Sequence, residues 1–384
     1  MRVPVRCVAV CFLASALTAV PQTVTQASPD VRVRAITAPK KPLPTEAESA
    51  SVTRFSFIAY GDTRAARVAG DETQYEHGLV VDAMLDAVKR LENSPYPIRF
   101  VLQSGDAVMI GAEAKRWNDG FVQHISRLTQ NGNIPYFFAV GNHDVTGALE
   151  VNSPDRKPGL RNTLDAIVNL IPPDGSPRRL NGYPTYSFGY GNSFFIAMDS
   201  NIAADETQFK WVKAQLDGLD RKRYTHVIVF FHHPPFSSGP HGGARVEPYA
   251  LTMRTRYLPL FRQHHVDMTI GGHEHLYEHW VERYEEGGKK YRMDHIVSGG
   301  GGAPLYPYTG EPDLTEYKRA AASEKLSVEH LVKPGLDRGE NPHHFVVVHV
   351  DGDKLDLEVI GVDWGTNFQP YRSRKTDLAD PQPR

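Results

Sequence analysis

The sequence predicts an α/β fold in which two mixed sheets form a β-sandwich flanked by helices. Short apolar segments alternate with amphipathic helical segments along most of the 384 residues, which is the pattern of strands alternating with helices. Several apolar segments end in a glycine or in a polar residue that can bind a metal. Sites in α/β proteins assemble at the carboxyl ends of strands, so these endings also predict where a site lies.

The N-terminus has the features of a secretory signal peptide. Arg2 and Arg6 form a short basic region, and the apolar run at residues 7–20 is too short to span a bilayer. We expect residues 1–27 to be removed and the mature chain to be secreted or periplasmic, with an uncleaved anchor as the alternative. Residues 28–51 are rich in proline, alanine and serine, which predicts a flexible linker.

Composition limits the kinds of partner and cofactor. A formal net charge of −2 gives no reason to expect binding to bulk nucleic acid, or to a membrane once the signal is removed. Both cysteines, Cys7 and Cys11, lie in the leader, so the mature chain would have no disulfide or thiolate ligand. Any metal must therefore be bound by histidine, aspartate, asparagine or glutamate, and the chain has 17 histidines.

The predicted elements follow one another in order. Strands are expected at residues 55–60, 98–102, 135–140, 194–198, 227–231 and 266–270, and helices at 79–91 and 206–216. Asp205 is expected to cap the second helix. Residues 345–350 and 354–362 predict two strands joined by a turn, which we assign to the far half of the second sheet. Residues 52–363 are thus predicted to form one domain, followed by a C-terminal tail at 364–384.

Five short polar motifs follow the predicted strands. They are Gly-Asp-Thr-Arg at 61–64, Gly-Asp-Ala at 105–107, Gly-Asn-His-Asp at 141–144, His-His-Pro-Pro at 232–235 and Gly-Gly-His-Glu-His at 271–275. A lone Gly-Asp is usually a turn, but the ordered set covers nearly the whole predicted domain. It resembles the calcineurin-like metallophosphoesterase superfamily, which includes purple acid phosphatases. The resemblance implies a metallophosphoesterase-type sandwich over residues 52–363.

The resemblance also implies a phosphoric ester hydrolase with two divalent metal ions, which we expect to be Mn, Fe or Zn. Two cations about 3.5–4 Å apart lower the pKa of a bound water and clamp the attacking and leaving oxygens. Carboxylates, other oxygen ligands and neutral imidazoles suit such ions. The resemblance assigns the bridge to Asp106, the first ion to Asp62 and His275, and the second ion to Asn142, His232 and His273.

Two further choices concern neighbouring histidines. The family pattern His-x-Pro favours His232 over His233 as the ligand, with the reverse as the alternative. His143 is expected to face the substrate, where an imidazolium would stabilise phosphoryl charge or protonate the leaving group. Asp144 would then hold the ring of His143 in one tautomer.

The chain departs from the family pattern at two positions. The histidine usual two residues after the first aspartate is Arg64, which has no lone pair for a metal but can contact phosphate bidentately. His77 is a candidate replacement ligand or substrate contact. Met109 stands where purple acid phosphatases have the tyrosine that binds ferric iron, which predicts a colourless enzyme.

The leading hypothesis is an exported phosphatase that hydrolyses small-molecule phosphomonoesters through a metal-bridging hydroxide. A phosphodiesterase or nucleotidase with the same centre is the alternative, and a non-catalytic protein that binds a phosphorylated ligand is a third. His241 closely follows the fourth motif and is expected to contact substrate. The sequence predicts no oligomeric state.

Overall fold

The computed structural model describes residues 32–66, 71–147, 150–242, 246–322, 325–362 and 375–377. The predicted signal peptide lies outside the described residues, as do residues 28–31 of the predicted linker and most of the C-terminal tail. No helix in the described part of the chain is long and apolar enough to span a bilayer.

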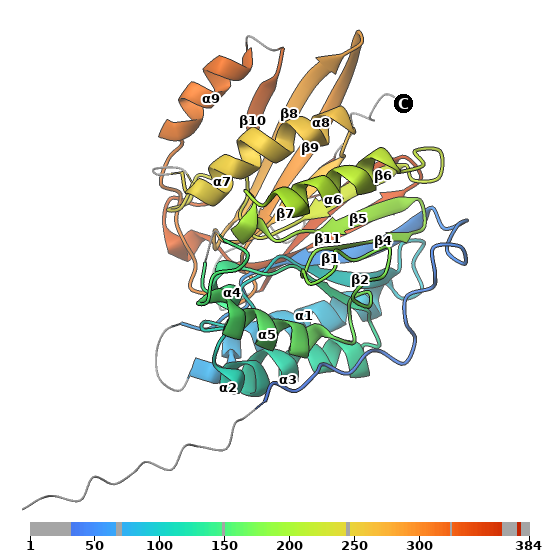
Figure 1. The fold of residues 1–384 in the computed structure, drawn as a ribbon, viewed down its shortest axis with the longest axis vertical. Helices are drawn as coiled ribbons and strands as arrows, with labels where there is room; N and C mark the ends of the chain where they lie inside the picture. Colours follow the sequence, from blue (N-terminus) through green and yellow to red (C-terminus); the bar gives the residue numbers. More distant parts are fainter. Residues whose placement is uncertain are drawn as a thin grey trace, which may run out of the picture. The chain divides into compact units, whose positions relative to one another are not determined.

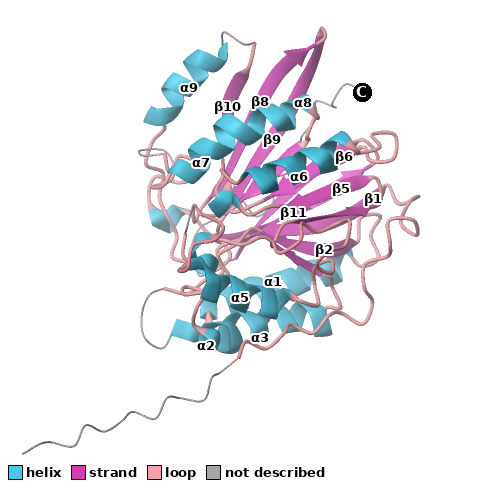
Figure 2. Cartoon of the chain, viewed as in Figure 1, coloured by secondary structure: helices cyan, strands magenta, loops and turns pink. Residues whose placement is uncertain are grey.

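The chain forms two mixed sheets, as predicted. The first sheet has the order β13-β12-β11-β1-β2-β3, with bounds Lys375–Asp377, Lys354–Val362, His343–Asp351, Arg54–Tyr60, Ile98–Gln103 and Tyr136–Phe138. The second has the order β10-β8-β9-β7-β6-β5-β4, with bounds Ser327–Val332, Tyr277–Glu286, Lys289–Ser298, Met268–Gly271, His226–Phe230, Ser193–Ala197 and Tyr186–Tyr190. Figure 2 shows the strands of both sheets with helices on either side.

Aromatic side chains join the two sheets face to face. The ring of Phe57 on β1 meets the ring of Phe195 on β5 at 5.3 Å between centroids, and Phe100 on β2 meets Phe195 at 5.1 Å. All three side chains are fully buried. Edge-to-face aromatic pairs of this kind add to the free energy gained from burial, so the middle of the sandwich is a closely packed apolar layer.

Helices cover the outer faces of both sheets (Figure 1). Beside the first sheet lie α1, α2, α3, α4 and α5, with bounds Tyr75–Leu91, Ala114–Arg116, Val122–Ser126, Asn142–Val145 and Arg156–Ile167. Against the second lie α6, α7, α8 and α9, with bounds Glu206–Asp217, Pro248–Thr252, Leu258–Gln263 and Pro312–Ala322. The side chain of Asp205 accepts a hydrogen bond from the backbone N–H of Gln208, which confirms the predicted cap of α6.

The C-terminal hairpin lies in a different sheet from the one predicted. Strand β11 pairs antiparallel with β1, so that Phe55 lies opposite Val350, and β12 continues outward from β11. The hairpin therefore extends the first sheet. Its sequence gives the strand period correctly, but it carries no local signal for a partner almost 300 residues earlier in the chain.

The described part of the predicted linker belongs to the folded unit, which corrects the prediction for residues 32–51. Ile36 is fully buried and Val33 nearly so, and both pack in the main apolar core. The carboxylate of Glu46 accepts hydrogen bonds from both Arg178 and Tyr224. Val33, Ile36 and the partly buried Leu43 are the apolar side chains of residues 32–51 that pack in this core, and they are too few to produce a periodic pattern in a sequence rich in proline and alanine.

Candidate metal centre

The loops after five strands meet at one end of the sandwich. Asp62 follows β1 and Asp106 follows β2, both from the first sheet, whereas His232 follows β6 and His273 follows β7 of the second. Asn142 is the first residue of α4, the short helix after β3. Asp62, Asp106 and His273 have positive φ angles of 59°, 56° and 70°. Non-glycine residues in this region carry backbone strain, which is concentrated at functional sites in proteins.

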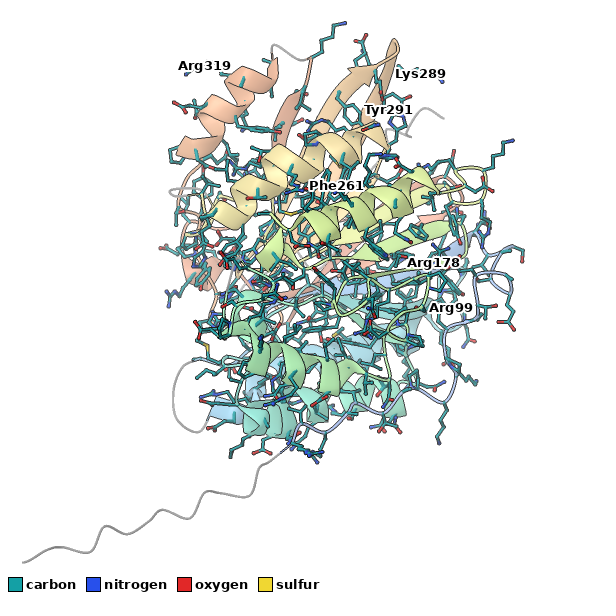
Figure 3. All side chains as sticks on the ribbon, viewed as in Figure 1. Arg99, Arg178, Phe261, Lys289, Tyr291 and Arg319 are labelled. Carbon is teal, nitrogen blue, oxygen red and sulfur yellow. The ribbon has the colours of Figure 1, made fainter. Side chains whose placement is uncertain are left out.

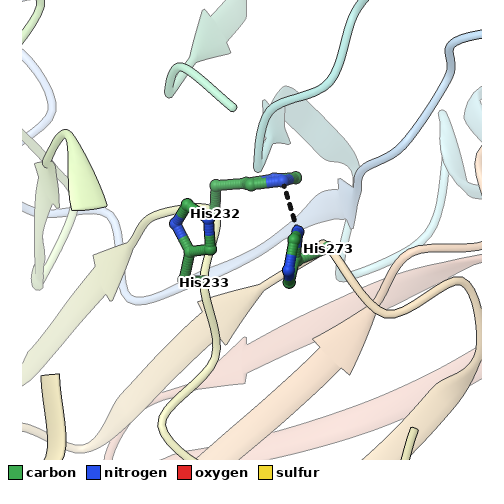
Figure 4. A group of neighbouring side chains, drawn as sticks. All are labelled: His232, His233 and His273. Carbon is green, nitrogen blue, oxygen red and sulfur yellow. Dashed lines mark hydrogen bonds between the residues drawn. The ribbon is translucent and has the colours of Figure 1, made fainter. Parts of the chain in front are cut away.

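Three polar atoms form a close triangle at this end. The Oδ1 atom of Asn142 lies 2.8 Å from Nε2 of His232 and 3.1 Å from Nδ1 of His273. The two ring nitrogens are themselves 3.1 Å apart. Figure 4 shows the rings of His232 and His273 directed toward each other. Oδ1 of Asp106 lies 3.3 Å from the same His232 nitrogen.

The surroundings fix where the protons of this triangle lie. Nδ1 of His232 is 2.9 Å from the carbonyl oxygen of Ser104, which can only accept, so that nitrogen carries the proton. Burial lowers the pKa of His232 to about 3, which keeps the ring neutral. Nε2 of His273 is 3.0 Å from a carboxylate oxygen of Glu247 and donates to it. When the ring of His273 carries only this one proton, the two nitrogens that face each other both carry lone pairs.

Three lone-pair atoms within about 3 Å of one another repel unless a proton or a metal cation lies between them. An amide oxygen, two neutral imidazole nitrogens and a nearby carboxylate form a donor set that suits Mn, Fe or Zn. The residues present thus fit a divalent cation at the triangle of Asn142, His232 and His273, which we call the triad site.

His233 has a different role from His232. The hydroxyl oxygen of Ser200 accepts hydrogen bonds from the backbone N–H groups of both His232 and His233. It then donates its own proton to Nδ1 of His233 at 2.9 Å. The proton of this ring therefore sits on Nε2, which has no acceptor among the described residues. A protonated nitrogen offers no lone pair, so the tautomer supports His232 as the candidate ligand.

A second set of donors lies beside the triad site and consists of Asp62, Asp106 and His275. Nδ1 of His275 donates to the carbonyl of Pro304 at 2.6 Å, which leaves a lone pair on Nε2, 3.5 Å from Oδ1 of Asp62. Oδ1 of Asp62 is buried and accepts no hydrogen bond from any described residue. Burial and the neighbouring Asp106 carboxylate raise the pKa of Asp62 well above its usual value. We call these three residues the carboxylate site.

Arg64 is directed into the carboxylate site. Its Nε is 3.3 Å from Oδ2 of Asp106, and one terminal nitrogen is 3.3 Å from Nε2 of His275. The other terminal nitrogen is 3.1 Å from the sulfur of Met109. Burial alone would raise the pKa of Asp106, but His232, His143 and Arg64 outweigh it and lower that pKa. The guanidinium is thus the cation nearest to these carboxylates.

His143 faces the site, but Asp144 does not orient it as predicted. Nδ1 of His143 donates to the carbonyl of Met109 at 2.9 Å, which leaves Nε2 facing the site, 3.9 Å from Oδ2 of Asp106. The carboxylate of Asp144 accepts backbone N–H groups of Asp106, Ala107, Val108 and Gly141 instead. Asp144 therefore ties the second and third motif loops together, a pairing for which the sequence carries no signal.

His77 is not brought to the site. Its ring is fully buried in the core, where Nδ1 lies 2.9 Å from Oε1 of Gln74 and Nε2 lies 3.1 Å from the hydroxyl of Tyr60. Burial lowers its pKa well below the usual value. Both nitrogens are engaged inside the core, so the structure gives no support to His77 as a replacement ligand. The correction follows from the way α1 turns this residue inward.

The site opens into a cavity of about 200 Å³. Its lining includes Arg64, Asp106, Asn142, His143, His241, His273 and His275, together with Gly147, Glu247, Tyr249 and Tyr306. His241 lies here, as expected for a substrate contact. Burial alone would lower its pKa, but the Glu274 carboxylate outweighs burial and raises it.

Three lining residues were missed by the sequence analysis. Glu247 accepts the proton of His273, Tyr249 stacks on His233 at 4.3 Å between centroids, and Tyr306 stacks on His275 at 4.1 Å. None of the three lies in a motif or directly after a strand, so no local pattern distinguishes them from ordinary loop residues.

The comparison with protein families agrees with this arrangement. The family model described as Calcineurin-like phosphoesterase matches residues 80–277, more than half of the chain. The chain belongs to this family. The resemblance inferred from the five motifs is thereby confirmed. The family is described as calcineurin-like phosphoesterases, and Asp62, Asp106 and His275 form a group that could hold a metal ion.

Relatives of this chain include purple acid phosphatases. It is 26% identical over 265 residues to "Probable inactive purple acid phosphatase 1" of Arabidopsis thaliana, covering 66% of this chain and 42% of that protein. It is 25% identical over 149 residues to "Fe(3+)-Zn(2+) purple acid phosphatase 12" of the same plant, covering 38% and 29%. The chain thus spans less than half the length of these two relatives.

Two further comparisons cover more of the chain. The "Serine/threonine-protein phosphatase CPPED1" of Rattus norvegicus is 23% identical over 279 residues, covering 70% of this chain and 79% of that protein. The solved structure of purple acid phosphatase PPD1 from yellow lupin (Lupinus luteus) seeds superposes with a TM-score of 0.59 at 20% identity, covering 85% of this chain and 54% of that one. The superposition confirms the predicted fold.

Proposed function

We propose that this phosphoesterase is an exported, metal-dependent phosphatase of small phosphomonoesters. The single observation that carries the proposal is that Oδ1 of Asn142 and one ring nitrogen each of His232 and His273 converge beside a cavity lined by Asn142, His273 and Arg64. A cation at the triad site would lower the pKa of a bound water and neutralise part of the phosphoryl charge.

The chain's own side chains account for substrate binding. Arg64 donates three of its five N–H groups to Asp106, Met109 and His275, and two remain for phosphoryl oxygens at the cavity wall. His241, whose pKa is raised by Glu274, adds positive charge on the same cavity. This charge matches a dianionic monoester better than a monoanionic diester, which favours the monoester.

His143 is the candidate general acid that protonates the leaving alcohol. Its Nδ1–H is held by the carbonyl of Met109, so Nε2 is the atom that faces the cavity. A proton carried at Nε2 could pass to the leaving oxygen as the P–O bond breaks. The ring of His143 is fixed by a backbone carbonyl, which orients it without a second side chain.

The choice between monoester and diester is tested by kcat/KM for p-nitrophenyl phosphate and bis-p-nitrophenyl phosphate with Mn²⁺ present. We expect a preference of tenfold or more for the monoester, about 1.4 kcal/mol in transition-state binding. The same preference for the diester would replace the proposal with a phosphodiesterase or nucleotidase. Tight metal binding without hydrolysis of either ester would indicate a non-catalytic phospho-ligand-binding protein.

Export rests on the basic and apolar leader at residues 1–27. Fractionation of cells that express the full chain tests it. Recovery from the medium or the periplasm, shortened at the N-terminus, is the expected result. Full-length chain in the cytoplasmic fraction would overturn the proposal of export.

A further inference from the structure

The two donor sets at the site differ in one respect. At the triad site, Oδ1 of Asn142, Nε2 of His232 and Nδ1 of His273 face one another, and no arginine or lysine of the described residues contacts these atoms. At the carboxylate site, the guanidinium of Arg64 already lies 3.3 Å from Oδ2 of Asp106 and 3.3 Å from Nε2 of His275. A guanidinium thus lies against the carboxylate site, whereas the contacts of the triad site involve no arginine or lysine among the described residues.

We propose that this chain holds a single divalent cation, at the triad site, and that the Arg64 guanidinium takes the place of a second. The inference rests on the proposed metal-dependent function and refines its cofactor. Metal–ligand bonds to histidine and carboxylate are about 2.0–2.2 Å long. A cation bound to Oδ2 of Asp106 and Nε2 of His275 would therefore overlap the guanidinium, and the two positive charges would repel.

The composition of the carboxylate site supports the same conclusion. Two positions where the family resemblance places ligands are occupied by Arg64 and Met109. Neither is a hard ligand for a divalent cation, and the sulfur of Met109 instead contacts the guanidinium at 3.1 Å. Only Asp62, Asp106 and His275 remain as donors among the described residues, and Arg64 already neutralises part of their charge.

The Arg64 side chain is also held in place at the carboxylate site by burial and by several contacts. The side chain is about 10% exposed, and each arm of the guanidinium has a different buried partner. Arginine stays protonated at all ordinary pH values, so this charge is permanent. The N–H groups that do not contact Asp106, His275 or Met109 are available to a phosphoryl oxygen, which is how one side chain would serve both as cation and as substrate contact.

Metal content tests the proposal without using turnover. The purified protein is saturated with Mn²⁺, freed of excess by gel filtration and analysed for Mn per chain, with electron paramagnetic resonance on the same sample. We expect one Mn per chain and the spectrum of an isolated ion. Two Mn per chain with an exchange-coupled spectrum would overturn the proposal.

Variants assign the position of the ion. Arg64→His places a ligand where the guanidinium was, and we expect its Mn content to rise toward two, while Arg99→His, the same exchange at an exposed position of β2 (Figure 3), stays at one. Asn142→Ala should lose the ion, whereas Asp62→Asn should keep it. Loss of the ion in Asp62→Asn and retention in Asn142→Ala would place it at the carboxylate site and overturn the assignment.

The outcome is separable from that of the proposed function. One Mn per chain without hydrolysis of any ester would contradict the proposed phosphatase function and support the single-cation proposal. Two Mn per chain with rapid monoester hydrolysis would support the phosphatase function and contradict the single-cation proposal. Thermal unfolding of Arg64→His shows whether it has folded, and the Mn content of the unaltered protein decides the main claim even if that variant fails.

Discussion

At the scale of single residues, the positions of protons decide which atoms can bind a metal. The His-x-Pro pattern favours His232 over His233 as the ligand, and their hydrogen-bond partners support the same choice. A carbonyl fixes the proton of His232 on the far nitrogen, whereas the Ser200 hydroxyl forces the proton of His233 onto the nitrogen that would otherwise be free. Sequence spacing cannot specify a tautomer.

His143 is expected to contribute to turnover and not to metal binding. Because its Nε2 faces the cavity and lies 3.9 Å from Asp106, His143→Ala should lower kcat by about 10²–10⁴, the usual contribution of a general acid. Mn content should stay unchanged. His264→Ala, at a half-buried histidine that lies beside Asp217 and does not line the cavity, is the matched control. Equal loss of metal and activity in His143→Ala would instead make His143 a ligand.

Met109 predicts the absence of colour. Its sulfur contacts Arg64, and no tyrosine occupies this position to bind ferric iron. Protein loaded with Fe³⁺ should therefore show no visible charge-transfer band in an absorption spectrum. An intense band between violet and red would contradict the account of this position.

At the scale of elements, close backbone packing between the motif loops holds the ligands in place. A Cβ atom at Gly272 would overlap Oδ2 of Asp62 and lie 2.8 Å from Oγ of Ser104. The glycine therefore allows the fifth motif to approach the first, and the backbone N–H of His273 donates to the same Asp62 oxygen at 2.8 Å.

Gly272→Ala should displace the Asp62 carboxylate and lower kcat/KM at least tenfold, because the added methyl group and the carboxylate cannot occupy the same space. Gly339→Ala is the control, since no heavy atom lies within 4 Å of its added Cβ. Steady-state kinetics with p-nitrophenyl phosphate compares the two variants. Wild-type kinetics in Gly272→Ala would show that this approach is not needed for activity.

The sequence predicted elements and motif positions better than it predicted long-range partners. The cap of α6 at Asp205 and the strand endings are local properties, so they could be read from the chain. The pairing of β11 with β1, the carboxylate of Glu247 behind His273 and the backbone contacts of Asp144 join segments distant in sequence. The helical period at residues 79–91 is also a local property, but one partner of His77, the hydroxyl of Tyr60, lies on β1.

At the scale of the whole molecule, several histidines are buried and neutral. His344 on β11 is fully buried, its Nδ1–H donates to the carbonyl of Pro342, and burial lowers its pKa to about 4 from an ordinary 6.5. Above pH 6.5 the ring is neutral in both the folded and unfolded states. As pH falls from 6.5 to about 4, the unfolded chain takes up the proton first, so the free energy of unfolding decreases.

Protonation of His344 alone should lower the free energy of unfolding by on the order of 3 kcal/mol between pH 6.5 and 4. The urea midpoint of the whole protein should fall across that range, and it should fall less steeply in His344→Gln, which has no proton to take up. The quantity to measure is the slope of the urea midpoint against pH, compared between the unaltered protein and His344→Gln. Identical slopes in the two proteins would mean that His344 is not the neutral, buried group described.

Hydrolysis is expected to depend on a cation at the meeting point of the two sheets, held by Asn142, His232 and His273. The most direct test is to strip the protein of metal with a chelator, remove the chelator and follow p-nitrophenyl phosphate hydrolysis as Mn²⁺ is added back. We expect no activity in the stripped protein, recovery on addition of Mn²⁺, and little or no recovery in Asn142→Ala. Full activity without metal, or wild-type recovery in Asn142→Ala, would contradict the account.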